Sequence, residues 1–450
     1  MSLARLALLV TVGLTACIRM IALVDEDAAV GDGDGDSDVD GDGDVVGACG
    51  VCGDGLVRCD EQCDDGARED GDGCDSGCRF EPVGGSCGDG ALDEGEVCDD
   101  GDVVNGDACN PTCNFANTTS LFVGAPGVQG GQDGSGRNAT LGGWGALAIL
   151  DDALWYGDGF NHVLRHIDLE SATVTTIAGD GAQQVADDAF GHRASFFSLE
   201  ALATDGNTVW VADLQRIRAV DTTPPYAVTT VAGDGTQGCA DGIGPAAQFQ
   251  DIRGLTYAHG FVWFLDSVCA TVRRFDPETT EVVTVAGSPC QVDPTTNNMI
   301  LVDGVGLSAC FGSPRYMATN MTDILYIADT NGAAIRTYDI TTQMVSTFAG
   351  TGIQAYLDGI GTAASIHRPR GLAVDGTSLY FTEFNQHTIR QGILATQEVS
   401  TMIGTQGAAG YQEGTGNGAM LNGPFSIVYH FPSASLFVLD SGNYVIRRIR

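Results

Sequence analysis

The 450-residue sequence predicts an all-β fold, a β-propeller of six blades, and three observations lead to this prediction. A β-branched run that ends on glycine recurs along the chain at a nearly constant interval. Four short strand-like segments fit within each interval, and the apolar residues there lack a helical period. A unit of fixed length stacked on copies of itself is a repeat architecture, and four strands per unit are typical of a propeller blade.

The recurring run marks the end of each unit. Its five copies are TVTTIAG ending at Gly179, AVTTVAG at Gly233, EVVTVAG at Gly287, MVSTFAG at Gly350 and EVSTMIG at Gly404. The final glycines lie 54, 54, 63 and 54 residues apart, so one interval contains an insertion, at 288–310. Residues 351–404 form the clearest whole unit.

Within a unit the signals keep one order. An acidic Gly-rich loop comes first, as at Asp358-Gly359, with Glu413-Gly414 as a variant. A short apolar strand follows, and its Asp-Gly ending at 375–376 predicts a tight hairpin turn. An alternating aromatic strand such as LYIAD (325–329) is next, then a strand that carries arginine, then the β-branched run. We therefore expect four antiparallel strands per blade, in chain order.

An acidic residue at the end of the aromatic strand recurs with an arginine seven residues later. The pairs are Asp158/Arg165, Asp266/Arg273, Asp329/Arg336, Glu383/Arg390 and Asp440/Arg447, and the second unit has a shorter step from Asp213 to Arg218. Catalysis needs one asymmetric place, so a pair repeated in every unit favours a structural role. We expect a turn clamp or an ion pair between blades.

This pattern resembles the NHL repeat over roughly residues 118–450, and the copy LYIADTNGAAIRTYD (325–339) is a close match to the strand–turn–strand core of that family. The last strand, YVIRRIR (444–450), is only the third of its unit. The segment 118–124 has the register of a fourth strand, with Gly124 55 residues before Gly179. We expect this N-terminal strand to close the sixth blade, which removes free sheet edges from the ring.

The first 17 residues read as an export signal, since a single arginine, a short apolar run and LTAC are too short for a permanent membrane span. LTAC is similar to the bacterial lipobox, which implies lipidation of Cys17, and Ile18 after it favours the outer membrane, with the protein facing the cell surface or the periplasm. An ordinary signal peptide is the alternative. Residues 18–48 read as a disordered acidic tether. Asp36, Asp38 and Asp40 mimic the start of a calcium loop, so Ca²⁺ is possible here, but Gly47 replaces the closing acidic ligand.

Two cysteine-rich segments, 49–82 and 83–117, align without a gap and resemble the cysteine-rich repeat of myxobacterial surface proteins. Their cysteines are Cys49, Cys52, Cys59, Cys63, Cys74 and Cys78 in the first and Cys87, Cys98, Cys109 and Cys113 in the second. An exported chain with small apolar-poor modules favours disulfides over zinc, because these segments hold no histidine. The propeller cysteines allow three pairings, and loop proximity favours Cys239–Cys269 and Cys290–Cys310.

The charge excludes several partners. The chain has 59 acidic and 21 basic residues, all the latter arginine, for a net charge of −38. Such a surface repels nucleic acid and anionic membrane, so we expect a monomer that meets the membrane only through its lipid.

Residues just before each inner strand usually lie near the channel mouth in such repeats. Aligned on Gly371, they are Trp144, Glu200, Arg253, Arg315, Arg370 and Phe425. Guanidinium forks at this place favour a carboxylate, phosphate or acidic peptide. The alternative is scaffold, because Arg-Gly is also ordinary repeat sequence. We expect binding at this mouth, on the face that carries the long loops, because the opposite face shows only tight turns.

Two kinds of propeller enzyme carry metal ligands at or near the same positions. Amidating-enzyme lyases carry histidine metal ligands there, whereas the seven histidines of this chain do not recur at one place (162, 166, 192, 259, 367, 387 and 430). Calcium lactonases need convergent acidic and amide ligands, and only Glu200 is available. No nucleophile elbow occurs. The sequence therefore predicts a non-catalytic binding platform for a protein, peptide or other extracellular ligand, with no firm cofactor. A hydrolase or lyase is the alternative.

Overall fold

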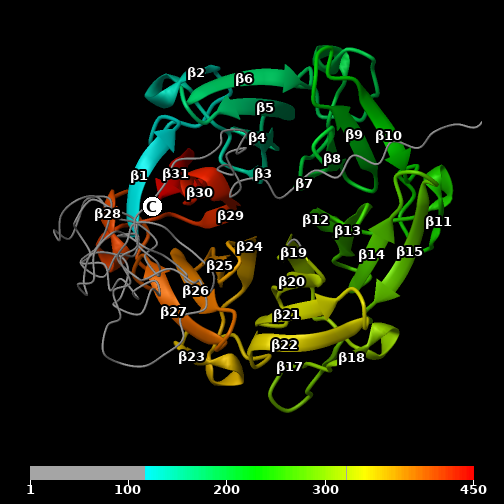
Figure 1. The fold of residues 1–450 in the computed structure, drawn as a ribbon, viewed down its shortest axis with the longest axis vertical. Coiled ribbons are helices and arrows are strands. Elements are labelled where there is room, and N and C mark those ends of the chain that lie inside the picture. Colours follow the sequence, from blue (N-terminus) through cyan, green and yellow to red (C-terminus); the bar gives the residue numbers. More distant parts are fainter. Residues whose placement is uncertain (1–116, 321) are drawn as a thin grey trace, which may run out of the picture. The chain divides into compact units, whose positions relative to one another are not determined.

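The computed structural model describes residues 117–320 and 322–450 (Figure 1). The predicted signal with Cys17, the tether at 18–48 with its possible calcium loop, and the cysteine-rich segments at 49–117, apart from Asn117, lie outside the described residues.

The described chain forms a closed ring of six antiparallel sheets, which confirms the six-bladed prediction (Figure 1). The blades follow one another in chain order. Blade 1 is β3 (Gly145–Leu150), β4 (Ala153–Asp158), β5 (Val163–Asp168) and β6 (Thr173–Ala178); blade 2 is β7 (Ala201–Thr204), β8 (Thr208–Ala212), β9 (Ile217–Asp221) and β10 (Val228–Ala232); blade 3 is β12 (Ile252–Ala258), β13 (Phe261–Asp266), β14 (Thr271–Phe275) and β15 (Glu281–Ala286). Blade 4 is β19 (Pro314–Thr319), β20 (Ile324–Asp329), β21 (Ala334–Asp339) and β22 (Met344–Gly350); blade 5 is β24 (Pro369–Val374), β25 (Ser378–Glu383), β26 (Thr388–Ile393) and β27 (Glu398–Ile403); blade 6 is β29 (Pro424–His430), β30 (Ser435–Asp440), β31 (Val445–Ile449) and β1 (Thr118–Val123).

Short elements complete the blades. Two-residue strands flank the outer strand in five of them: β2 (Gly134–Ser135), β11 (Gly242–Ile243), β18 (Gly304–Val305), β23 (Gly359–Ile360) and β28 (Gly414–Thr415). The insertion carries a hairpin of β16 (Gln291–Val292) and β17 (Met299–Ile300). The 3₁₀ turns are η1 (Gly136–Asn138), η2 (Gly191–Arg193), η3 (Gly244–Ala246), η4 (Gly306–Ser308), η5 (Gly361–Ala363), η6 (Gly416–Gly418), η7 (Phe431–Ser433) and η8 (Ser441–Asn443). Within the described residues, no helix has the length and apolar content needed to cross a bilayer.

The landmark glycine of each unit has a steric reason. Gly179 has φ +98°, and a Cβ there would lie 2.6 Å from the His162 carbonyl oxygen. The other four, at 233, 287, 350 and 404, also have positive φ. Only glycine adopts this backbone at little cost, so the chain can leave the outer strand and turn toward the next blade.

The cores lie between neighbouring sheets. Trp155 and Leu164 of blade 1 pack with Phe196, Leu202 and Val211, which belong to blade 2 and the segment before it. Each such apolar side chain contributes about 1.5–3 kcal/mol when fully buried. The alternating pattern of the strands therefore stabilises the ring blade against blade.

The ring is closed by the N-terminal strand, as predicted. β1 pairs antiparallel with β31, with Thr119 opposite Ile449 and Leu121 opposite Arg447. Thr118 N donates to the Arg450 carbonyl oxygen at 2.8 Å. Residues more than 300 positions apart thus share one sheet, and the sixth blade is completed by both ends of the propeller.

Candidate functional site

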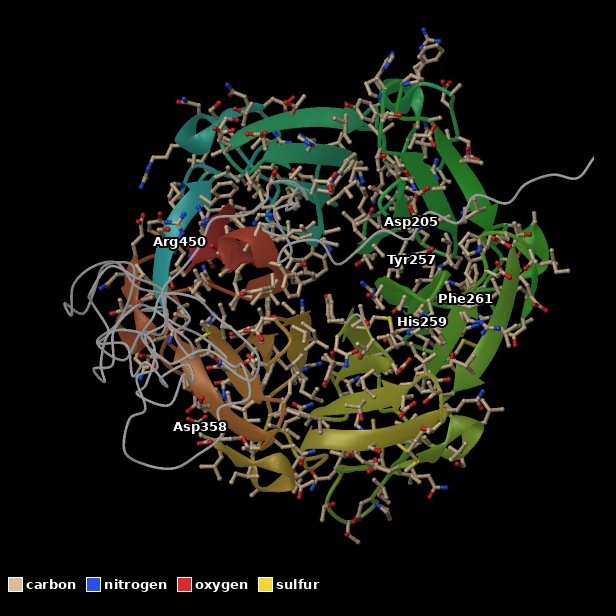
Figure 2. All side chains as sticks on the ribbon, in the orientation of Figure 1. Asp205, Tyr257, His259, Phe261, Asp358 and Arg450 are labelled. Carbon is tan, nitrogen blue, oxygen red and sulfur yellow. A yellow bond between two sulfur atoms is a disulfide. The ribbon has the colours of Figure 1, made fainter. Side chains whose placement is uncertain are left out.

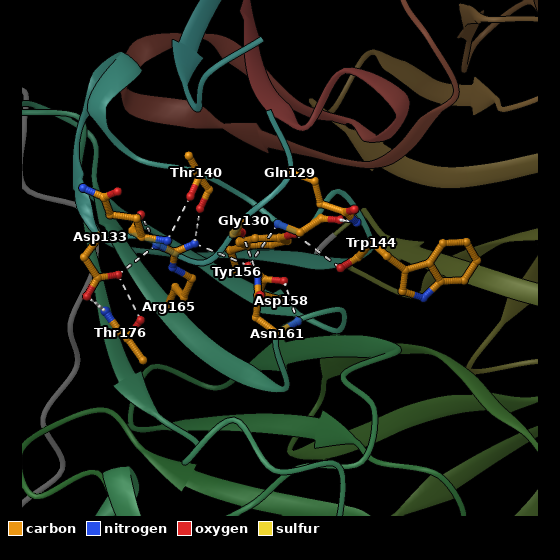
Figure 3. A network of polar contacts seen from close by, with 12 residues as sticks. Gln129, Gly130, Asp133, Thr140, Trp144, Tyr156, Asp158, Asn161, Arg165 and Thr176 are labelled. Carbon is orange, nitrogen blue, oxygen red and sulfur yellow. Dashed lines mark hydrogen bonds and ion pairs between the residues drawn. The ribbon is translucent and has the colours of Figure 1, made fainter. Parts of the chain in front are cut away.

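The recurring acid–arginine pairs are clamps inside single blades. In blade 1, Arg165 donates from Nη1 to the Thr140 carbonyl at 2.7 Å and from Nη2 to Asp133 at 2.8 Å, and its Nη1 lies 3.4 Å from Asp158 (Figure 3). Asp158 also accepts from the amide of Gly142 in the loop before the inner strand. The arginine therefore ties the acidic loop to the blade.

The clamp recurs around the ring with every arginine buried. These arginines are Arg165, Arg218, Arg273, Arg336, Arg390 and Arg447. Burial raises the pKa of Glu383 to about 7 and that of Asp440 to about 6. Blade 6 differs, because Glu413 pairs with Arg137 at 3.4 Å and Arg447 is held by Asp440. Of the two structural roles expected, the clamp within a blade is the one observed.

Consecutive antiparallel strands define two faces of the ring. The loop face carries the segments between blades and the turns between second and third strands. The hairpin face carries the turns between first and second and between third and fourth strands. Asn117 and Arg450 lie beside the hairpin residues Asp375 and Thr377, so the chain enters and leaves the propeller on the hairpin face.

The six candidate residues lie at the loop-face ends of the inner strands, with one shift in register. The inner strands of blades 3 to 6 have a bulge, which β3 lacks. Ala148 is opposite Trp155 just as Thr256 is opposite Trp263, so Gly145 rather than Trp144 corresponds to Arg253. Trp144 nevertheless reaches the mouth, 40% exposed, whereas Phe425 is 1% exposed and belongs to the core.

Arg253 is neutralised at the mouth. Its Nη1 lies 2.5 Å from Glu200 and its Nε lies 2.9 Å from Asp251. Burial is the largest influence on Glu200 and raises the pKa of its carboxyl above the ordinary value, although Arg253 opposes this. Arg253 thus forms half-buried ion pairs with Glu200 and Asp251.

Arg370 is held by aromatic rings. Its guanidinium carbon lies 4.2 Å from the Phe384 ring centroid, 4.7 Å from Phe425 and 5.9 Å from Trp144. Within residues 117–320 and 322–450, neither Arg370 nor Arg315 forms an ion pair or a hydrogen bond. Burial and the nearby charges of Arg315, Arg368 and Arg253 lower the pKa of Arg370. The mouth therefore holds three arginines, of which Arg253 is paired with Glu200 and Asp251, while the side chains of Arg315 and Arg370 form no ion pair within the described residues.

Phe384 and Tyr316 were not among the candidates from sequence. Phe384 follows the clamp acid of blade 5, where the other blades carry Gly159, Leu214, Ser267, Thr330 and Ser441. An aromatic residue at this position in one repeat alone was a sequence signal that could have identified Phe384 as a candidate. Tyr316 packs edge-on to Phe425 at 5.6 Å, and burial raises its pKa to about 12.

A cavity of about 270 Å³ occupies the channel on the other side of this cluster. Glu200 and Tyr316 line its inner end, and Tyr257, Tyr429 and Phe431 line its hairpin-face end. Its walls combine small residues, such as Ala148 and Ala203, with larger apolar ones, such as Leu202 and Leu255, from the inner strands. The expectation that the hairpin face offers only tight turns is therefore incomplete, since the channel cavity lies toward that face.

The two propeller disulfides are Cys239–Cys269 and Cys290–Cys310, the pairings that loop proximity favours. The first links a loop between blades to the second–third turn of blade 3, and the second spans the insertion. Both lie on the loop face. Among the described residues no three His, Cys, Asp or Glu side chains are grouped as metal ligands.

Comparison with known proteins finds similarity to proteins that are named for the NHL repeat. The chain is 27% identical over 315 residues to human NHL repeat-containing protein 2, which covers 62% of this chain and 43% of that protein. It is 26% identical over 285 residues to SUPPRESSOR OF QUENCHING 1 of Arabidopsis thaliana, covering 60% and 26%. The chain thus spans less than half the length of these curated relatives. No protein-family profile matches the sequence.

Solved structures share the fold at low identity. A protein described as an auxiliary nutrient binding protein from Bacteroides thetaiotaomicron superposes with a TM-score of 0.56 at 18% identity, covering 74% of this chain and 76% of that one. A protein with the same description from Bacteroides ovatus gives 0.56 at 15% identity with the same coverages. These likenesses concern the fold.

Proposed function

We propose that the chain is an exported, lipid-anchored binding protein whose propeller captures an anionic group of an extracellular ligand at the loop-face mouth. The observation that carries this proposal is the lack of any ion pair at Arg315 and Arg370 within the described residues, in a chain of net charge −38. A carboxylate, a phosphate or an acidic side chain of a peptide would supply the missing partner.

The chemistry of the mouth supports an anion. Arginine presents a planar fork that binds carboxylate and phosphate in two parallel hydrogen bonds. Arg253, Arg315 and Arg370 repel one another, which is part of why the pKa of Arg370 is lowered. An anion bound among them would relieve this repulsion. Trp144, which is partly exposed beside Arg370, offers an apolar surface to the body of the ligand.

The structural neighbours described as auxiliary nutrient binding proteins support a binding role for this fold. Loops on a rigid scaffold are common recognition sites, and the insertion and both propeller disulfides lie on the same face as the mouth. Asn117 lies on the opposite face, beside Asp375. The described chain therefore begins on the face opposite the mouth.

The test is calorimetric titration of the purified full chain with propane-1,2,3-tricarboxylate and with inorganic phosphate. The double change Arg315→Ala and Arg370→Ala should weaken anion binding about ten-fold or more, since a hydrogen bond to a charged group contributes about 1.5–3 kcal/mol. Arg193→Ala is the matched control, because Arg193 also stacks on a ring, that of Phe190 at 4.8 Å, but away from the mouth.

Wild-type affinity in the folded double variant would overturn the proposal, as would an equal loss in the Arg193 control. Turnover of either anion, or of esters of the tricarboxylate, would instead favour the enzymatic alternative.

A further inference from the structure

The channel cavity behind the mouth has the features of a second binding site. It is lined by all six inner strands and holds about 270 Å³, enough for a small organic molecule. The small side chains of four alanines leave space in the channel: Ala148, Ala203, Ala318 and Ala373. The inner strands are sheet edges, so the backbone polar groups on their channel side have no strand partner, whereas those on the other side pair with the second strand of the blade.

Several hydroxyls of the cavity have no protein partner. Among the described residues, Tyr257, Tyr316, Tyr429 and Thr256 form no side-chain hydrogen bond, and all four are half-buried. Tyr316 lies at the inner end, and Tyr257 and Tyr429 lie at the hairpin-face end. A half-buried hydroxyl without a partner in the protein is available to a ligand or to water.

Aromatic rings and carboxylates lie close together around the hairpin-face opening of the channel, which we call the rim. Tyr429 stacks with Tyr380 at 6.4 Å and meets Phe431 edge-on at 5.0 Å, and the Tyr380 hydroxyl donates to Asp375 at 2.8 Å. Across the channel, Trp210 Nε1 donates to Asp205 at 3.1 Å.

The rim is negative. Burial raises the pKa of Tyr257, and the charges of Asp205 and Glu278 raise it further; burial and Asp375 do the same for Tyr429. Figure 2 shows Asp205 and Tyr257 on neighbouring blades beside the central opening.

Acidic residues are also common over the rest of the hairpin face. The acidic residues in or beside its turns are Asp151, Asp152, Asp168, Glu170, Asp205, Asp221, Asp276, Glu278, Glu281, Asp323, Asp339, Asp375 and Glu398, and Arg450 lies on the same face. His259, in one of these turns, lies 3.2 Å from Asp323, and Arg274 stacks on Phe261 at 4.1 Å. The face opposite the arginine mouth therefore attracts cations.

We propose that the channel cavity, entered from the hairpin face, binds a small organic cation, an ammonium group joined to an apolar or aromatic body. The rings of Tyr257, Tyr429 and Phe431 would contact the cation and its body, the rim carboxylates would supply the attraction, and the free hydroxyls would orient the ammonium group. A cation over an aromatic face gains energy that neither a neutral nor an anionic analogue gains. The proposed contacts lie at the hairpin-face end of the cavity, whereas Glu200 and Tyr316 at its inner end border the arginine mouth.

A series of probes with one shape and three charges tests the proposal. The probes are 2-phenylethylamine, 2-phenylethanol and 3-phenylpropionate, titrated calorimetrically into the full chain at neutral pH. The amine should bind about ten-fold more tightly than the alcohol, and its affinity should fall as salt is added. An alcohol that binds as tightly as the amine, a carboxylate that binds best, or no amine binding at millimolar concentration would each overturn it.

Variants place the site. The pair Asp205→Asn and Asp375→Asn should reduce amine affinity about ten-fold and leave the alcohol unchanged. Asp339→Asn is the matched control. Asp339 accepts a hydrogen bond from the backbone amide of Thr341 at 2.8 Å, just as Asp205 accepts one from that of Asn207 at 2.9 Å, but Asp339 belongs to a turn between third and fourth strands, away from the channel. The double variant Arg315→Ala and Arg370→Ala should keep amine binding; its loss there would show that the amine binds elsewhere. Circular dichroism checks that each variant is folded. The comparison of the three probes uses the wild-type chain and does not depend on the variants.

Discussion

The residues that decide this molecule's stability and its binding chemistry are the same type, arginine, in two different surroundings. The six clamp arginines are buried and paired with a carboxylate of their own blade, as Arg390 is with Glu383 at 3.1 Å. Arg315 and Arg370 have no such partner within the described residues. Breaking a buried pair leaves an uncompensated charge and costs about 3–5 kcal/mol. Substitution of a clamp arginine should therefore unfold a blade, whereas substitution at the mouth should affect binding.

At this scale the pKa of Glu383 gives a pH dependence. Burial raises it to about 7 from 4.5, so the folded state keeps a proton that the unfolded state releases. The free energy of unfolding should therefore fall as pH rises from about 4.5 to about 7, by at most about 3 kcal/mol from this group. Glu383→Gln should remove this part of the pH profile, measured by urea unfolding.

The control is Glu398→Gln, an exposed glutamate on β27, the outer strand of the same blade. Other buried carboxyls, Asp440 among them, contribute to both profiles, so the informative quantity is the difference from wild type. Parallel profiles for Glu383→Gln and wild type would contradict the prediction.

At the scale of elements, β1 is the part on which the ring depends. It pairs with β31, and its removal would leave the sixth sheet without a fourth strand. An open ring would expose strand edges and the apolar faces of two neighbouring blades. The same strand also joins the N-terminal region to the propeller at Asn117.

Two truncations test this closure. A chain lacking residues 1–125 should aggregate or melt several degrees lower, whereas a chain lacking 1–116 should keep the stability of its propeller. Thermal unfolding followed by circular dichroism, with light scattering for aggregation, measures both. Equal melting temperatures would show that β1 is dispensable.

At the scale of the whole molecule, the two ends of the channel differ in their charged residues. Arginines gather at the loop-face mouth, while the hairpin face, where the chain enters, carries carboxylates around the channel opening. The two proposals together place an anion at one end of the channel and a cation at the other. The proposed anchor at Cys17 would hold both sites at the cell envelope.

The anchor itself gives a cellular prediction. Cys17→Ala should move the protein from the detergent phase to the aqueous phase when cell envelopes are partitioned, because the acyl chains supply the membrane affinity. Immunoblotting of the two phases measures it. A Cys17→Ala protein that stays as membrane-bound as wild type would rule out lipid anchoring at this residue.

The sequence alone determined the propeller, its six blades, the closing strand and the residue pairs of the clamps. These features are periodic, and each copy of a pattern such as the one ending at Gly179 or Gly350 reports the same local conformation. The contents of the channel were decided only by tertiary structure. Ring closure brings Arg370 of blade 5 against Trp144 and Phe425, residues from blades 1 and 6 that no single repeat contains. A missing bulge moved Trp144 by one register position, and the single aromatic at Phe384 supplied a ring that the repeat pattern does not encode. Side-chain packing across the axis depends on such departures from the repeat, and periodicity carries no information about them.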